Sequence, residues 1–66
     1  MKYIVTYSDG SSEVFKSEFE AMGMIDRWIR EHYNSRVAWI GISEAYPVDE
    51  NRVPIGCSST IKKVGT

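Results

Sequence analysis

The sequence predicts an α+β domain in which one helix packs on one face of a small, mostly antiparallel, four-stranded sheet. Two stretches rich in β-branched and aromatic residues, at 3–7 and 12–16, predict an N-terminal hairpin. A single amphipathic stretch over 17–33 predicts the helix. Two apolar stretches follow it, so the expected order is β-β-α-β-β within one domain, residues 1–66. This order also permits a mixed, β-grasp-like sheet with the first and last strands central and parallel.

The hairpin is predicted by the pair Asp9-Gly10 between its strands, because an Asp-Gly turn adopts the positive φ angles that tight hairpins need. Its register depends on the loop length. A two- or four-residue loop pairs Val5 with Val14. A three-residue loop with Gly10 in the left-handed conformation pairs Ile4 with Val14 instead. The sequence alone leaves both registers open.

The helix is predicted to begin at a capping box, in which the Ser17 hydroxyl accepts from the backbone N–H of Glu20. At 100° per residue, its apolar stripe is centred on Met22, Ile25 and Ile29. Phe19 and Tyr33 flank the stripe on one side, with Trp28 and Met24 on the other. Gly23 lies towards the polar side, and nothing in the sequence accounts for it.

After the helix, the stretch RVAWIGISEAY at 36–46 predicts a third strand, and residues 57–64 predict a weaker final one. Residues 47–54 between them read as a loop bounded by prolines. Because strand side chains alternate between faces, Trp39 is expected on the open face of the sheet. Ala38, Ile40 and Ile42 are then expected beneath the helix.

Composition excludes several classes of protein. Eight Lys and Arg residues against nine Asp and Glu residues give a net charge of −1, which disfavours a dedicated nucleic-acid binder. No run approaches transmembrane length, so no membrane association is expected. Cys57 is the only cysteine, so a disulfide within the chain is excluded and a cytoplasmic protein is favoured. A chain this short is only marginally stable alone, which favours self-association.

Candidate catalytic and ligand-binding residues are few. His32 and Cys57 do not form a recognisable nucleophile pair, so we expect no enzymatic activity. One Cys and one His also fall short of a zinc site, and no cofactor or metal is expected. The oxygen-rich stretch Asp49-Glu50-Asn51 is read as a solvated turn, since it lacks the ligand spacing of a calcium loop.

Aromatic residues carry the functional prediction. Trp, Tyr and Phe are enriched at protein interfaces, and the open sheet face and the flank of the helix are expected to carry them. The sequence therefore predicts a non-catalytic protein-binding module, which self-associates as a dimer and regulates or inhibits a larger protein. The expected partner-binding residues are Trp39, Tyr3, Phe15, Tyr46, Met24 and Trp28. The alternative is single-stranded nucleic-acid binding, with the sheet aromatics stacking on bases.

Overall fold

The computed structural model describes residues 1–65 and contains five strands and one helix. In chain order these are β1 (Lys2–Thr6), β2 (Ser12–Phe15), α1 (Glu18–Tyr33), β3 (Arg36–Ile40), β4 (Glu44–Val48) and β5 (Ser59–Val64). The α+β class is confirmed. The expected four strands are corrected to five, because the stretch predicted as one strand after the helix forms two.

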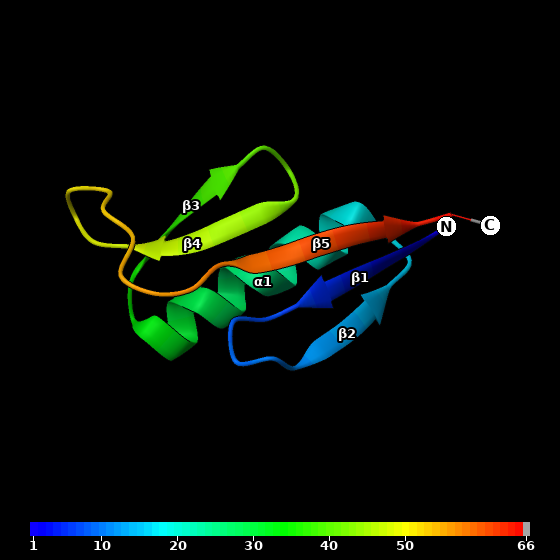
Figure 1. Cartoon of the computed structure of the whole chain (residues 1–66), viewed down its shortest axis with the longest axis horizontal. Coiled ribbons are helices and arrows are strands. Elements are labelled where there is room, and N and C mark those ends of the chain that lie inside the picture. The colour runs from blue at the N-terminus through cyan, green and yellow to red at the C-terminus, as the bar shows by residue number, and fades with distance from the viewer. Residues whose placement is uncertain (66) are drawn as a thin grey trace.

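The strands form one sheet in the order β2-β1-β5-β4-β3, and every pairing is antiparallel (Figure 1). The first and last strands are neighbours, as in the β-grasp-like alternative, but they run antiparallel. That alternative is therefore wrong in strand direction. The five-strand order explains the difference, because the added hairpin β3–β4 reverses the chain once more before it enters β5.

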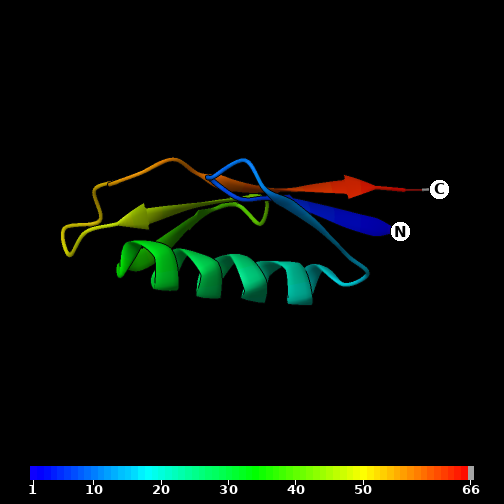
Figure 2. The same ribbon diagram turned by 90° about the horizontal axis from the view of Figure 1, so that it is seen from below.

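Helix α1 lies along one face of the sheet, and no helix or strand of residues 1–65 covers the opposite face (Figure 2). The residues between them form the hydrophobic core. Its buried members are Val5, Tyr7, Ala21, Ile25, Ile29, Ala45 and Ile61. Burying a side chain such as Ile25 contributes about 1.5–3 kcal/mol. The expectation that the helix packs on one face is confirmed.

The ends of α1 follow from local chemistry. Ser17 is the N-cap, and its Oγ accepts from the backbone N–H of Glu20 at 3.4 Å. Asn34 ends the helix in the left-handed conformation, with φ at 50°. The buried stripe is turned relative to the expected one, because Ala21 rather than Met22 joins the two isoleucines in the core. As a result Phe19, expected beside the core, is 87% exposed.

The first hairpin has the three-residue loop. Ile4 pairs with Val14, and Tyr3 pairs with Phe15. Gly10 takes a φ of 93°, a conformation that side chains with a Cβ rarely adopt. The Asp9 carboxylate accepts hydrogen bonds from the hydroxyl and the backbone N–H of Ser11. These bonds hold the pKa of Asp9 below its usual value.

The second hairpin is the one that the sequence did not reveal. Gly41, with φ at 64°, opens a turn over residues 41–43, and β4 follows at once. Pro47, expected to open a loop, is instead buried within β4. Its missing N–H is tolerated on the β3 side, because Pro47 pairs with Val37 at a position where the two residues exchange no hydrogen bond. The strand therefore continues through the proline.

Candidate protein-binding surface

Three of the predicted binding residues lie on the helix side of the sheet. Tyr3, Phe15 and Trp39 are half-buried against the core. For Trp39 this corrects the expected face: it pairs with Ala45, which is buried beneath α1, and directly paired residues share a face. Ala38 consequently lies on the open face.

The shape of the helix explains this reversal. A helix is round in cross-section, so the gap between helix and sheet widens from the central strands towards the edges. Small Ala45 fits directly beneath α1, whereas the edge strands need large side chains to reach it. Trp39 on β3 and Phe15 on β2 fill those gaps. Alternation along one strand could not show this, since both faces of residues 37–40 are apolar.

The two predicted residues of the helix flank lie in different surroundings. Trp28 is half-buried, and its ring stacks between Tyr7, at a centroid distance of 4.9 Å, and His32, at 3.9 Å. It is therefore part of the fold's aromatic packing. Met24 lines a shallow groove on the outer surface of α1.

Tyr46 is the predicted residue that does lie on the open face, since it alternates with buried Ala45 and Pro47. Among the described residues, it is the only aromatic whose strand position points to that face. The other positions there alternate between aliphatic and polar residues; Val14, 60% exposed, and Ile40, 59% exposed, are the most open apolar ones. For the alternative of single-stranded nucleic-acid binding, the open face therefore offers one aromatic side chain, Tyr46, for stacking on bases.

The free edge of β3 provides a surface that the sequence did not predict. On the side of β4 that faces away from β3, hydrogen bonds are accepted by the odd-numbered residues of the β4 segment. Ile61 N–H donates to the Ser43 carbonyl at 2.8 Å, and Ile55 N–H donates to the Pro47 carbonyl at 2.9 Å. A strand residue directs its N–H and C=O to the same side. Pro47 therefore faces away from β3.

Because Val37 pairs with Pro47, this pair is not hydrogen-bonded, and the same holds for Trp39 and Ala45. Ala38 instead exchanges hydrogen bonds with Tyr46 across the hairpin. The N–H and C=O groups of Val37 and Trp39 consequently point outward, away from the sheet. β3 thus presents two donors and two acceptors along an open edge.

A hollow of about 300 Å³ runs beside this edge, lined by residues 36–39 together with Val48 and Arg52. Natural sheets protect such edges with prolines, bulges or charges within the strand. The interior of β3, Val37-Ala38-Trp39, has none of these. Its charge is confined to Arg36 at the start. This edge is chemically ready to pair with another strand.

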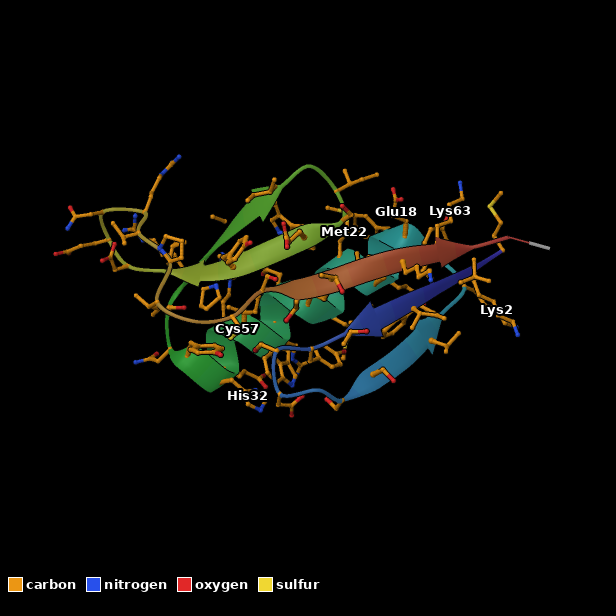
Figure 3. All side chains as sticks on the ribbon, in the orientation of Figure 1. Lys2, Glu18, Met22, His32, Cys57 and Lys63 are labelled. Carbon is orange, nitrogen blue, oxygen red and sulfur yellow. The ribbon has the colours of Figure 1, made fainter. Side chains whose placement is uncertain are left out.

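His32 and Cys57 are the two candidate catalytic residues of the sequence. Figure 3 shows His32 and Cys57 towards the C-terminal end of α1, with Lys2, Glu18 and Lys63 at the opposite end of the molecule. The His32 Nδ1–H donates to the Trp28 carbonyl at 3.1 Å while its ring stacks on that indole. Cys57 is exposed and free. No hydrogen bond joins the two within residues 1–65.

The loop after β4 is held by one carboxylate. Asp49 Oδ1 accepts from the backbone N–H groups of Asn51, at 2.8 Å, and Val53, at 2.9 Å. The carboxylate is thereby used in shaping the turn. Within residues 1–65, no three His, Cys, Asp or Glu side chains are grouped as metal ligands would be.

The part of the chain that the structure describes contains no helix long and apolar enough to cross a membrane. Comparison with protein-family models, with curated proteins and with solved structures found no match. The function must therefore be inferred from the molecule's own surfaces. Of these, the β3 edge is the one whose outward main-chain donors and acceptors are defined by the strand pairing.

Proposed function

We propose that this chain is a non-catalytic protein-binding module that acts by adding a strand to the free edge of β3, and that its first partner is a second copy of itself. The observation that carries the proposal is the outward pair of residues, Val37 and Trp39, on a strand with no protective feature. Strand addition of this kind obtains its affinity from main-chain hydrogen bonds.

The strand is complementary to itself. Two copies related by a two-fold axis pass β3 antiparallel to β3 of the partner, with Ala38 facing Ala38 at the axis. Val37 then lies opposite the partner's Trp39, and the two residues exchange both of their hydrogen bonds. The same exchange occurs on the other side of the axis. All eight outward groups of the two strands are satisfied, and the two sheets join into one of ten strands.

Side chains are compatible with this register. On the helix side, each Trp39 meets Val37 of the other copy, an aromatic and β-branched pair of the kind that stabilises sheets. On the open face, Arg36 lies beside Ile40. The two Arg36 residues stand four positions apart along the pair, about 13 Å, which exceeds the screening length of about 8 Å in physiological salt.

A larger partner that offers its own strand to the β3 edge would compete with the second copy. This is the way in which such a module would regulate or inhibit another protein, and exchange between the two partners would depend on their relative concentrations. We propose the dimer first because β3 of a second copy can pair with β3 in a register that satisfies all of the outward main-chain groups.

The test is sedimentation velocity of the wild type and of Val37→Pro at low micromolar concentration. Proline at position 37 removes an outward donor and leaves the hydrogen bonds between β3 and β4 in place, because Val37 donates nothing to β4. We expect a dimer for the wild type and a 7.5 kDa monomer for the variant. A wild type that stays monomeric throughout would refute the proposal.

The matched control is Val14→Pro on the opposite edge. Tyr7 N–H donates to the Ser11 carbonyl, so alternation places the N–H of Val14 outward as well. This variant introduces the same backbone restriction at an equivalent edge site and should remain dimeric. Hydrogen exchange gives a second readout, since the amides of Val37 and Trp39 should become protected as the protein concentration rises.

A further inference from the structure

The outer surface of α1 carries a hollow of about 420 Å³ on the side of β2, remote from the β3 edge. Its lining residues are Phe15, Phe19, Glu20, Gly23, Met24 and Arg27. One of these residues, Phe19, is the most exposed large hydrophobic side chain of the molecule's described part. An exposed aromatic next to an apolar hollow indicates a contact surface.

Gly23 is one of the residues that line this hollow. In the middle of a helix, glycine is markedly less favourable than alanine. Neither the core nor the backbone requires it, since a Cβ built there would meet nothing within 4 Å, and its φ is not among the positive ones. The feature that glycine provides here is a helix surface low enough for another backbone to approach closely.

The charged residues that line the hollow indicate which charges a helix packed on it must carry. Glu20 lies three residues before Gly23, and Arg27 lies three residues after Met24. A helix that crosses antiparallel, centred between Gly23 and Met24, must carry a basic residue opposite Glu20 and an acidic one opposite Arg27. Helix α1 of a second copy meets this requirement, because the two-fold axis brings each Glu20 opposite the other copy's Arg27.

We infer that the Gly23 hollow is a second self-association surface, on which α1 packs antiparallel against α1 of another copy. Phe19 then packs along Met24 and the aliphatic stem of Arg27 of that copy. Arg27 is available for the new pair, since its present bond to Glu31, 3.1 Å long, joins two exposed side chains and is readily exchanged.

This contact does not depend on the proposed β3 pairing, because the two surfaces lie at opposite sides of the molecule and can be occupied together. The helix contact involves one short crossing and a small apolar area, so it belongs to the weak, transient class of interface. The β3 dimers are then expected to join through their helices at high protein concentration, forming assemblies of four or more copies.

The experiment is sedimentation velocity from low micromolar to millimolar concentration on four proteins: wild type, Val37→Pro, Gly23→Lys and the double variant. The lysine fills the hollow and has a higher helix propensity than glycine, so the variant should unfold at a higher temperature. Loss of association therefore cannot be ascribed to unfolding.

We expect the wild type to exceed the dimer at high concentration and Gly23→Lys to remain a dimer throughout. Val37→Pro should be monomeric at low concentration and dimeric at high concentration, and the double variant should be monomeric at all concentrations. If the assemblies of Gly23→Lys increase in size with concentration as those of the wild type do, the helix contact is refuted. The β3 proposal is tested separately, by the low-concentration state of Val37→Pro.

A charge exchange tests the antiparallel register, on the Val37→Pro background. Glu20→Arg places two arginines opposite each other, and Arg27→Glu does the same with two glutamates. Each single change should weaken the helix-linked dimer several-fold, and the combination of both should restore it. Failure of the combination to recover affinity would refute this register, and melting temperatures measured in parallel report any change in helix stability.

Discussion

The two outer strands of the sheet, β2 and β3, differ in how well each could pair with a copy of itself. β2 has four residues, and the centre of any symmetric pairing through its outward residues, Ser12 and Val14, is Glu13. Two copies joined there would set Glu13 against Glu13, and like charges directly opposite each other destabilise a sheet. β3 has five residues, and the corresponding centre is the uncharged Ala38.

A side-chain hydrogen bond adds to the difference. The Tyr7 hydroxyl donates to Glu13 Oε1 at 2.7 Å, so the residue that protects the β2 edge also ties β2 to the core. β3 has no equivalent hydrogen bond among the described residues, because its inward side chains, Val37 and Trp39, contribute apolar packing. The Glu13 carboxylate therefore disfavours symmetric pairing at β2, whereas Ala38 places no charge at the corresponding position of β3.

The largest expected effect concerns what the two edges contribute to the core. Trp39→Ala should destabilise the monomer by about 2–3 kcal/mol, since it removes a half-buried aromatic from the gap beside α1. Val14→Ala on β2 should stay within about 0.5 kcal/mol, because Val14 is on the open face. Urea unfolding at a fixed, low concentration measures both. Equal losses would mean that Trp39 does not pack under the helix.

The next largest effect is expected in the turns of the two hairpins that contain the outer strands. Gly10→Ala and Gly41→Ala each place a Cβ on a residue with positive φ, at 93° and 64° respectively. The second angle is close to the left-handed region that other residues reach, at about 1–2 kcal/mol, whereas the first is not. Gly10→Ala should therefore lower the melting temperature more. The comparison with Gly41→Asn sharpens this, since asparagine tolerates the left-handed conformation and should be nearly neutral.

The smallest effect tests the tie between β2 and the core. Burial, together with the hydrogen bond to Glu13, raises the pKa of Tyr7 well above its usual value of 10. The folded state then holds this proton more tightly than the unfolded state. Stability should be complete below pH 10 and fall as the pH rises above it.

Tyr7→Phe removes the bond between hydroxyl and carboxylate, and it should cost about 0.5–1.5 kcal/mol near neutral pH. The variant should also show a shallower loss of stability above pH 10 than the wild type, which chemical denaturation across pH measures. An unchanged alkaline slope would show that Tyr7 does not set it.

Several features were predictable from the sequence because short-range chemistry decides them. The capping box at Ser17, the Asp9-Gly10 hairpin and the amphipathic helix each require only neighbouring residues. The second hairpin was missed because Ile42-Ser43 does not resemble a turn and Pro47 resembles the end of a strand. Gly41, after five strand residues, was the signal that could have indicated it.

The candidate site was less predictable, and for a different reason. Trp39 was correctly singled out as a residue of the third strand, but alternation gives only which residues share a face, not which face meets the helix. That choice depends on Ala45, which pairs with Trp39 and fits beneath α1 where an indole would not. The role of Trp39 in binding stays a prediction, and it now concerns the outward N–H and C=O groups of its backbone.

The features with a local cause follow from neighbouring residues: one capped helix, one tight hairpin and an apolar stripe. The single cysteine likewise excludes a disulfide within the chain. The strand order, the direction of β5 beside β1 and the face on which each aromatic lies become known only once the chain is folded. These depend on which strands become neighbours and on the round profile of the helix above them. The open β3 edge belongs to the second group, since a strand is at an edge only when the whole sheet has been assembled.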